Sequence, residues 1–584
     1  MKFRWNIVPA QPLLAAEIGR KAGISPLLAQ CLINRGHSIP EQIDQFLQPR
    51  LKHLSDPFLL PDMGLAVERL FRAREAKELV VVFGDYDVDG VTSTALVLEV
   101  LNRLGCRSEY YLPSRMDEGY GLSQEAADNC LRKFPASLLL AVDCGSTAVE
   151  CIGSLKRRGT DVIVLDHHQP GESLPPAVAL VNPQIRATAS SLANAAGDFR
   201  ELCSVGLAFK LAHALVKRGR DLGLPEAVDF DVRTLLDLVA LGTVADLVPL
   251  INENRVLVSA GLERLNQTRR PGLMALKKVA QCREPLGAYE VGFQLGPRLN
   301  AAGRLETAED ALRLLLAADG TSAMALALGL DTRNRERQDI ERSITRQAIE
   351  VTRASFDPQR DYAIVQASPD WHIGVVGIVA SKVLQQFHRP TIILGGDGGL
   401  LRGSGRSIAG FDLAAALNQC HDLLLRHGGH AMAAGVSLEP AQLDAFRRKF
   451  SDVARQTISP EALQPGLRLD GQVDLRELGM KPVQELNRLR PMGQGNPAVQ
   501  FCSCKVTHRK PLLRMGTDKR HVKMWVTDGS VTHEAVWWGA GDGALPVGEF
   551  DLAFAPGIND FNGNSTVQLK VLDWRPATRS ESAL

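Results

Sequence analysis

Between about residues 79 and 250 the sequence alternates short apolar runs with helix-length amphipathic segments. The runs ELVVVF, SLLLAV and DVIVL are rich in Val, Ile and Leu, and the segments between them include TALVLEVLNRLG and AVECIGSLKRRG. Continuous apolar strands separated by helices are typical of a parallel sheet that is covered on both faces. We therefore predict a doubly wound α/β domain in this part of the chain.

The remaining segments predict further domains, as expected for a chain of 584 residues. Helical periodicity covers about residues 201–265 and again about 305–355, and the charged second half of the later stretch favours a solvated helix between two domains. Alternating strands follow the second α/β pattern and predict a small barrel or sandwich. The predicted parts are an N-terminal helical segment (1–50), the first α/β domain (51–265), a connecting region with a long helix (266–355), a smaller α/β domain (356–455) and the β domain (465–584).

Composition excludes several classes of protein. No apolar run reaches the roughly 18 residues that span a bilayer, and the N-terminal MKFRWNIVPA lacks the pattern of a secretory signal, so we expect a cytoplasmic protein without a membrane segment. The ten cysteines show no CxxC spacing and are expected to be reduced thiols. The net charge of +1 gives no global sign of a polyanionic partner.

Acidic and imidazole side chains follow each predicted strand of the first domain. The positions are Asp85, Asp87 and Asp89 after VVVF, Asp143 after LLLAV, and Asp166, His167 and His168 after VIVL; Asp246 ends a later helical run. Residues beyond the carboxyl ends of parallel strands converge on one crevice. Like charges in one crevice repel unless a cation lies among them. The pattern therefore predicts a metal centre.

Oxygen ligands with one or two imidazoles and no thiolate favour Mn²⁺ or Mg²⁺, and there are enough ligands for two ions. Two metal ions about 4 Å apart serve phosphoester hydrolysis. A lone DxD after a strand is usually a turn or a helix cap, but four such positions favour the metal. Asp166 has two interpretations, a metal ligand or a residue that only orients His167.

The motifs DYDVDG, VDCGS, DHH and the AD of LGTVAD, in this order, resemble the DHH phosphoesterase superfamily. GGHAMAAG at 428–435 resembles the glycine-rich motif of the DHHA1 domain. GPRLNAAGR at 296–304, WHIGVVGIVASK at 371–382 and GSGRS at 403–407 are similar to motifs of the RecJ family. The resemblance implies a metal-dependent exonuclease that degrades single-stranded DNA 5′ to 3′ to mononucleotides in recombination and repair, with an OB-fold at the C-terminus.

By position, the resemblance makes Asp87, Asp89, Asp143, His167 and Asp246 the metal ligands. Asp85 and Asp166 become further acids of the catalytic site, and His168 faces the scissile phosphate. It also implies single-strand-binding protein and a helicase as partners.

The other motifs predict contacts to DNA. Ser404 and Arg406 of GSGRS suit a terminal phosphate, with Arg115 as a second cation; the resemblance makes this the 5′-phosphate pocket. Tyr120 either stacks on a base or packs in the protein. GGHAMAAG is predicted as a loop that enters a helix and approaches phosphate oxygens. The DNA-binding candidates are Arg115, Tyr120, Arg298, Asn300, Arg304, Ser404, Arg406, Gly428, Gly429 and His430.

In the β domain, Trp525, Trp537 and Trp538 lie among lysines and arginines, which suits an OB-fold that stacks bases, although we expect most of these tryptophans to be core.

Two other functions are compatible with the motifs. One is a DHH phosphodiesterase for short oligoribonucleotides or other small phosphoesters, and the long β domain argues against it. The other is a DNA-binding scaffold without catalysis, and the complete set of acids argues against that.

Overall fold

The computed structural model describes residues 3–114, 118–119, 121–185, 199–305, 307–541, 543–561 and 563–577. The chain divides into two compact units. Unit A comprises Gln45–Arg337 and Arg490–Pro497, and unit B comprises Met1–Asp44, Gln338–Leu489 and Ala498–Leu584. None of the described helices is both long and apolar enough to cross a membrane.

Unit A contains the predicted parallel sheet. Its strands are β2 (Leu79–Phe83), β3 (Arg107–Tyr111), β4 (Leu138–Val142), β5 (Asp161–Leu165) and β6 (Ala179–Val181). Their spatial order is β3-β2-β4-β5-β6, and all neighbours are parallel. The chain order reverses between β2 and β4, so the crevice of a doubly wound sheet opens at the carboxyl ends of these two strands.

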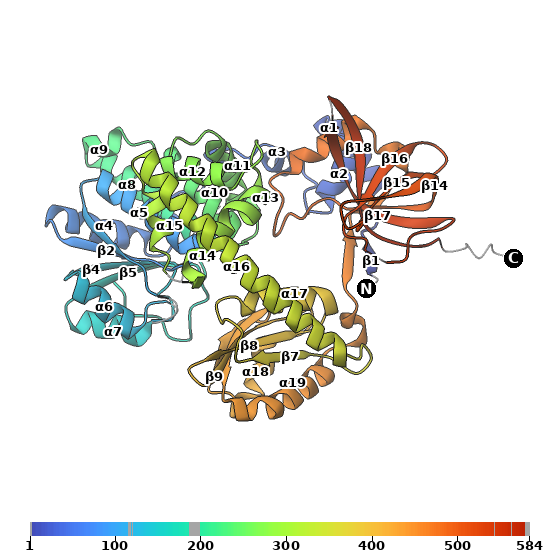
Figure 1. The fold of residues 1–584 in the computed structure, drawn as a ribbon. Helices are drawn as coiled ribbons and strands as arrows, with labels where there is room; N and C mark the ends of the chain where they lie inside the picture. The colour runs from blue at the N-terminus through green and yellow to red at the C-terminus, as the bar shows by residue number, and fades with distance from the viewer. Residues whose placement is uncertain are drawn as a thin grey trace. The chain divides into compact units, whose positions relative to one another are not determined.

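Helices cover both faces of this sheet, as the apolar strands require. One face carries α4 (Met63–Glu75), α5 (Val88–Arg103) and α8 (Ser204–Asp221), and the other carries α6 (Gln124–Lys133) and α7 (Val149–Arg157) (Figure 1). Successive residues of β2 alternate between two cores: Val80 and Val82 belong to one, and Val81 and Phe83 to the other. The doubly wound prediction is confirmed.

The rest of unit A is helical, as predicted for about residues 201–265 and from about residue 305 onward. The helices are α9 (Pro225–Val228), α10 (Leu236–Ala245), α11 (Asn252–Asn266), α12 (Pro271–Val279), α13 (Ala288–Glu290), α14 (Gly296–Leu305) and α15 (Glu309–Leu315). Helix α10 is buried on all sides, which explains why LDLVALGTVA has no polar face. The long helix α16 (Gly320–Ser355) begins in unit A and ends in unit B.

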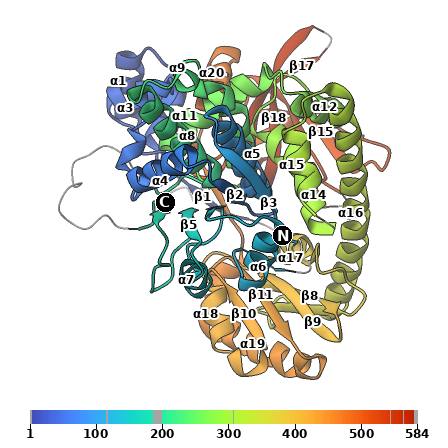
Figure 2. The same ribbon diagram turned by 90° about the vertical axis from the view of Figure 1, so that its left-hand side faces the viewer.

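Unit B contains the second α/β pattern. Its strands are β7 (Ile364–Ser368), β8 (Thr391–Asp397), β9 (Leu400–Arg406), β10 (Arg426–Gly429) and β11 (Ala433–Leu438), in the order β10-β11-β9-β8-β7. Helix α17 (Val376–Phe387) covers one face, and α18 (Leu413–Asn418) and α19 (Leu443–Thr457) cover the other (Figures 1 and 2). Only β7 and β8 are parallel among these neighbours.

The motif GGHAMAAG forms a β-hairpin, so its prediction as a loop entering a helix is wrong. Gly428 and Gly429 end β10, the backbone N–H of His430 donates to Ala433 O at 2.8 Å, and β11 follows directly. Gly429 has φ of 141° and a Cβ there would lie 2.4 Å from Ala433 O, so the tight turn requires glycine. Backbone hydrogen bonds between β10 and β11 determine this conformation.

The C-terminal part of unit B is a closed barrel. Its strands are β14 (Phe501–Met515), β15 (His521–Thr527), β16 (Thr532–Trp537), β17 (Phe550–Phe561) and β18 (Asn564–Pro576). The ring closes because β14 pairs with both β15 and β17.

The tryptophans of this barrel are not core, contrary to the prediction: Trp525 and Trp537 are half-buried and Trp538 is 54% exposed. Lys510 and Lys523 lie over the Trp525 ring, at 5.2 and 5.4 Å from its centroid.

The N-terminal segment is helical only after a first strand, which was not predicted. Strand β1 (Arg4–Ile7) pairs in parallel with β12 (Gly466–Leu469), and α1 (Pro12–Ala22), α2 (Pro26–Ile33) and α3 (Pro40–Leu47) follow. Four residues with a partner far along the chain carry too little local pattern to be recognised.

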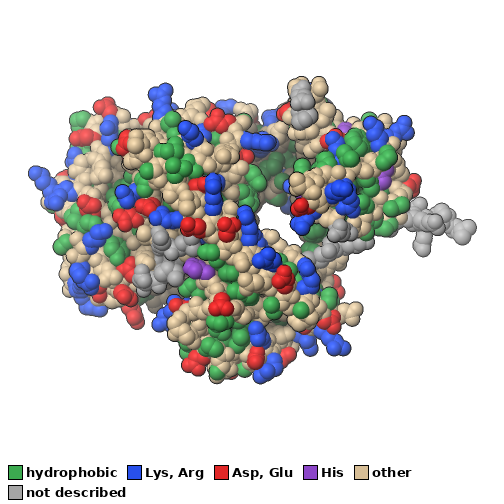
Figure 3. Space-filling view, viewed as in Figure 1, with side chains coloured by type: hydrophobic (Ala, Val, Ile, Leu, Met, Phe, Trp, Pro, Cys, Tyr) green, Lys and Arg blue, Asp and Glu red, His purple; other side chains and the backbone are tan. Residues whose placement is uncertain are grey.

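One face of the protein shows charged side chains of both signs (Figure 3). On the face shown in Figure 3, the coloured lysine and arginine side chains are interspersed with aspartate and glutamate. This mixture agrees with the net charge of +1.

Candidate metal centre

The loop after β2 carries the first three acids. Asp87 is the N-cap of α5, and its Oδ1 accepts the N–H of Gly90 at 3.0 Å. A Cβ at Gly90 would lie 2.6 Å from Asp85 O, so the loop folds tightly against the helix start. Asp85 and Asp89 are buried, at 1% exposure each. The loop thus holds three carboxylates at the sheet edge where the crevice opens.

The N-terminus of α8 contributes polar groups to this edge. The N–H groups of Ser204 and Val205 donate to the two oxygens of Asp89 at 2.7 and 2.8 Å. The Ser204 hydroxyl donates to Asp143 Oδ1 at 2.8 Å. These contacts fix the orientations of two buried carboxylates. Ser204 and Val205 were not predicted at this site, because nothing in the sequence around a helix start signals a contact to an acid more than a hundred residues earlier.

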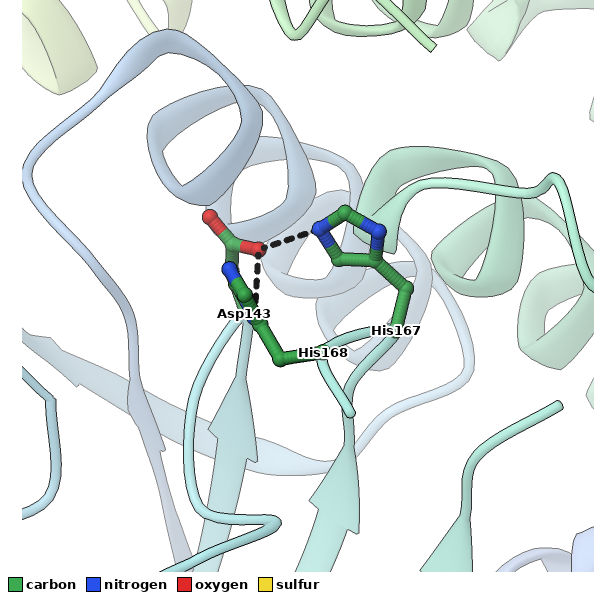
Figure 4. Close-up of side chains that lie close together, drawn as sticks. All are labelled: Asp143, His167 and His168. Atoms are coloured by element: carbon green, nitrogen blue, oxygen red, sulfur yellow. Dashed lines mark ion pairs between the residues drawn. The ribbon is translucent and has the colours of Figure 1, made fainter. Parts of the chain in front are cut away.

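His167 stands at the middle of the cluster. Its Nε2 lies 3.5 Å from Asp143 Oδ1, 3.7 Å from Asp246 Oδ2 and 3.9 Å from Asp89 Oδ2. Figure 4 shows the rings of His167 and His168 both directed at the carboxylate of Asp143. Asp246 is the C-cap of α10 and reaches the site from a helix end, as its position after the apolar run suggested.

The Asp166 carboxylate forms hydrogen bonds with His168. Its Oδ1 lies 2.7 Å from His168 Nδ1 and accepts the His168 backbone N–H at 3.1 Å, while its Oδ2 accepts the N–H of Ser146 at 3.0 Å. Both oxygens are therefore engaged. Of the two interpretations of Asp166, the geometry favours an orienting residue, with His168 as the residue it orients.

Burial and mutual repulsion raise the pKa values of three carboxyl groups in the cluster. Burial, reinforced by Asp87, raises the pKa of Asp89 to about 7. Burial and then Asp89 raise the pKa of Asp246 to about 9, and the same two causes raise the pKa of Asp143 well above its usual range. The cluster therefore resists carrying its full negative charge without a cation.

The pKa values of the two histidines shift in opposite directions. Burial, and then the neighbouring His168, lowers the pKa of His167 to about 4, so its imidazole is neutral near pH 7. Burial alone would lower the pKa of His168, but its hydrogen bond with Asp166 raises it above the usual value. Burial alone would raise the pKa of Asp166, but the hydrogen bond from His168 lowers it below the usual range. His167 suits a metal ligand, and His168 suits a cationic hydrogen-bond donor.

The donors fit divalent metal ions. Three groups of donor atoms each lie within 4.8 Å of one another, namely Asp143 with His167 and His168, Asp89 with Cys203 and Asp246, and Asp85 with Asp87 and Asp143. The Nε2 of His167 is buried and has no hydrogen-bond partner among the described residues. Among the residues that the structure describes, His167 is the only one with a side chain that can carry positive charge at ion-pair distance from Asp89 or Asp246. Oxygen donors with one neutral imidazole match Mn²⁺ or Mg²⁺.

Cys203 was not predicted at this site. Its thiol belongs to the group formed with Asp89 and Asp246, and burial raises its pKa well above the usual value. A buried thiol that stays protonated is a poor ligand for hard cations.

The motif GPRLNAAGR packs against the loop that follows β2 and carries Asp85, Asp87 and Asp89. Asn300 Oδ1 accepts the N–H of Val88 at 3.2 Å, and a Cβ at Gly303 would lie 2.7 Å from Tyr86 O. Arg298 donates from Nε to Asp331 Oδ1 at 2.9 Å. Two of the predicted DNA-binding side chains, Asn300 and Arg298, therefore have structural partners, and Arg304 is half-buried in the same helix.

The first four residues of the motif GSGRS end strand β9 of unit B. The Nη1 of Arg406 donates to Ser404 Oγ at 2.7 Å, and a Cβ at Gly377 would lie 3.1 Å from Arg406 Nη2 and 3.2 Å from Ser404 Oγ. Gly377 is in the first turn of α17, so a guanidinium and a hydroxyl lie beside a helix N-terminus, an arrangement that suits an anion. In the neighbouring strand, Gly435 pairs with Ser404. Arg115 and Tyr120 lie outside the described residues.

Three domain families match the chain. The DHH family, N-terminal domain, matches residues 79–243, the DHHA1 domain matches residues 360–456, and the RecJ OB domain matches residues 469–573. Full-length similarity decides the family. A Bacillus subtilis protein is 36% identical over 98% of this chain and 71% of its own length. An Escherichia coli protein is 35% identical over 94% of this chain and 95% of its own length. Both are named single-stranded-DNA-specific exonuclease RecJ.

The chain belongs to the RecJ family. The crystal structure of RecJ from Thermus thermophilus in complex with Mn²⁺ superposes with a TM-score of 0.84 and 31% identity, over 100% of this chain and 81% of that one. The same protein in complex with Mg²⁺ superposes with a TM-score of 0.76 and 29% identity, over 99% of this chain and 79% of that one. The predicted DHH, DHHA1 and OB folds are confirmed.

The raised carboxyl pKa values predict that metal binding and pH act together on stability. Asp89 and Asp246 have pKa values of about 7 and about 9 in the folded, metal-free chain, well above the ordinary 3.8. The folded state then holds protons that the unfolded state has lost, so the free energy of unfolding in EDTA falls as pH rises from about 4 to about 9. Mn²⁺ removes the repulsion, and we expect it to raise the melting temperature more at pH 9 than at pH 6.

Thermal melting in EDTA and in Mn²⁺ across this pH range measures the effect. Asp246→Asn should flatten the EDTA profile, and an Asp246→Asn profile as steep as that of the wild type would contradict the assignment.

Proposed function

We propose that this RecJ-family chain is a metal-dependent exonuclease that hydrolyses single-stranded DNA 5′ to 3′ to mononucleotides, in DNA recombination and repair. The observation that carries the proposal is the buried cluster around His167, where carboxylates of raised pKa converge without a lysine or arginine partner among the described residues. The ionised carboxylates of such a cluster repel one another unless a cation lies among them, and the Bacillus subtilis and Escherichia coli relatives are named single-stranded-DNA-specific exonucleases.

In this proposal, two Mn²⁺ or Mg²⁺ ions are held by Asp87, Asp89, Asp143, His167 and Asp246, with Asp85 as a further acid beside them. Bound ions of this kind activate water and stabilise the leaving oxygen of a phosphoester. The backbone amides of Ser204 and Val205 keep Asp89 in its orientation. The Nε2 of His167 completes the ligand set, because its low pKa keeps the imidazole neutral.

His168 acts on the substrate in this scheme. Its side chain is 37% exposed, whereas those of Asp143 and Asp166 are 2% exposed each. A protonated His168 held by Asp166 places a charged donor at the open side of the centre, where a scissile phosphate would lie.

The 5′ polarity is assigned to unit B. Ser404 and Arg406 beside the start of α17 form the proposed 5′-phosphate site of unit B. Arg115 as a second cation and Tyr120 as a stacking residue remain predictions from the sequence, because both lie outside the described residues. The hairpin residues Gly428, Gly429 and His430, and Arg298, Asn300 and Arg304 of α14, are proposed to line the path of the strand. For Arg298 and Asn300 this role has to coexist with the contacts to Asp331 and Val88.

Several broader features belong to the same proposal. Single-strand-binding protein and a helicase would supply and expose the substrate, and the cytoplasm is where such DNA is found. The division into 1–50, 51–265, 266–355, 356–455 and 465–584 is part of the same proposal.

Degradation of one single-stranded DNA oligomer, labelled separately at each end, tests the proposal. With Mn²⁺, the 5′ label should appear at once as a mononucleotide, and EDTA or Asp87→Ala should abolish its release. If long DNA survives while short oligoribonucleotides are cleaved, the small-phosphoester function replaces the proposal. Binding without cleavage would indicate a scaffold.

Replacement of Arg406 should weaken the preference for a 5′-phosphate. A hydrogen bond to a charged group contributes about 1.5–3 kcal/mol, so Arg406→Ala should reduce the rate ratio between 5′-phosphorylated and 5′-hydroxyl oligomers by about tenfold to a hundredfold. Arg402→Ala is the matched control, because Arg402 lies on the same strand but pairs with Asp397 at 2.7 Å. An unchanged ratio in Arg406→Ala would place the 5′-phosphate elsewhere.

A further inference from the structure

A short segment from late in the sequence packs into unit A. Arg490–Pro497, with the sequence RPMGQGNP, follows the DHHA1 part of the chain and precedes β14, yet it groups with Gln45–Arg337. We call Arg490–Pro497 the strap. Its contacts fall on the residues that follow Asp246, one of the proposed metal ligands.

The strap fits closely against Pro249 and Leu250. The backbone N–H of Leu250 donates to Gln494 O at 2.7 Å. A Cβ at Gly493 would lie 2.8 Å from Leu250 Cδ1, and a Cβ at Gly495 would lie 2.9 Å from Pro249 Cβ. Gly495 also has φ of 72°. Both glycines are required for the approach, and Leu250 is 2% exposed beneath them.

Asn254, near the start of α11, links this contact to the other side of the metal centre. Its Nδ2 donates to Pro249 O at 3.0 Å and to Glu201 O at 2.5 Å. Glu201 lies three residues before Ser204, whose N–H and hydroxyl bind Asp89 and Asp143. One buried amide therefore joins the loop after Asp246 to the segment that orients the other acids.

The next residue, Arg255, holds the start of the strap. It is 2% exposed, and its guanidinium donates to Arg490 O at 2.9 Å, to Pro491 O at 3.4 Å and to Phe46 O at 2.7 Å. Within the strap, Asn496 is fully buried and donates to Pro491 O at 2.8 Å. Buried donors satisfied by backbone carbonyls make the strap a fixed part of unit A.

We propose that the strap is a positioning element of the metal centre. The strap packs on Pro249 and Leu250 and so holds the loop that carries Asp246 in position. Through Asn254 it also holds the segment that begins at Glu201, whose residues orient Asp89. This inference rests on the proposed metal ligands Asp246 and Asp89. It makes Gly495 and Arg255 positioning residues that act on metal affinity from outside the ligand set.

Direct Mn²⁺ binding to the full-length protein tests the strap, with free Mn²⁺ measured by electron paramagnetic resonance. Gly495→Ala introduces a methyl group against Pro249 on a backbone of positive φ, and we expect Mn²⁺ affinity to fall threefold to tenfold. The Mn²⁺ concentration for half-maximal nuclease activity should rise by the same factor, while saturating Mn²⁺ restores kcat. Gly529→Ala is the control, because φ is 92° there but no atom lies within 4 Å of its Cβ.

Arg255→Lys provides a second, independent variant, because one ammonium replaces a guanidinium that serves three carbonyls. It should also weaken Mn²⁺ binding, and it decides the question if Gly495→Ala does not fold. Asp246→Asn distinguishes a wrong ligand assignment from a wrong strap proposal. If Asp246→Asn binds Mn²⁺ as the wild type does, the ligand assignment is wrong. If Asp246→Asn binds weakly while each folded strap variant stays within twofold of the wild type, the strap proposal is overturned.

Discussion

Asp143→Asn should abolish nuclease activity and, in the absence of metal, stabilise the protein. Loss of a metal-binding charge removes several kcal/mol of transition-state stabilisation, so we expect a rate at least about a thousandfold lower. The pKa of Asp143 is raised well above its usual range by burial and by Asp89. A folded-state pKa above the unfolded value means that the carboxylate costs stability as pH rises, so the neutral amide should melt higher in EDTA at pH 8 by about 2 °C or more.

Asparagine is the appropriate replacement at this position. Asp143 has φ of 64°, a left-handed conformation that asparagine adopts readily and alanine does not. The side-chain amide of asparagine would also keep an oxygen for the Ser204 hydroxyl. The variant therefore removes charge with little change of backbone.

Asp128→Asn is the matched control for the removal of one carboxylate, because Asp128 pairs with Arg158 on the surface. It should leave activity near the wild-type level. Full activity of Asp143→Asn would exclude Asp143 as a ligand, and a lower melting temperature in EDTA would contradict the electrostatic argument.

His168→Ala should lower the rate by about a hundredfold to ten-thousandfold without loss of Mn²⁺ binding. A side chain that donates a proton or a charged hydrogen bond contributes a factor of this size. His168 Nδ1 lies 2.7 Å from Asp166 and 4.0 Å from Asp143, so its primary partner is the orienting acid. Electron paramagnetic resonance of Mn²⁺ separates the two roles, because weakened Mn²⁺ binding in His168→Ala would make His168 a ligand.

Asp166→Asn tests the same pair through pH. The hydrogen bond with Asp166 raises the pKa of His168 against the effect of burial, so its removal lowers that pKa. If the protonated imidazole is the active form, the alkaline limb of the pH–rate profile should move to lower pH in Asp166→Asn. An unshifted alkaline limb would show that His168 is not needed in its protonated form.

Much of unit A was predictable because the signals are local. A buried parallel strand must be apolar along its whole length, so VVVF, LLLAV and VIVL identify β2, β4 and β5 from sequence alone. The acids directly after these runs were predicted to meet because parallel strands end at one edge. The structure places them there, with His167 Nε2 within 3.9 Å of three carboxylates.

Contacts between distant segments were not predictable. Strand β1 pairs with β12, GGHAMAAG turns back on itself as a hairpin, and the strap reaches Pro249 and Leu250. In each case the partner lies outside any sequence window, and backbone hydrogen bonding or a steric fit decides the outcome. The exposed position of Trp538 likewise depends on which barrel face has a neighbour.

The roles of individual polar residues divide in the same way. The sequence by itself determined the fold class and which acids and histidines gather at the candidate metal centre, because apolar runs and strand-end positions are properties of short segments. Only the tertiary structure decided that Asp166 orients His168, that Arg298 pairs with Asp331 and that Asn300 caps the start of α5. Partner choice depends on distances of a few ångströms between elements, and these are set by packing of the whole unit.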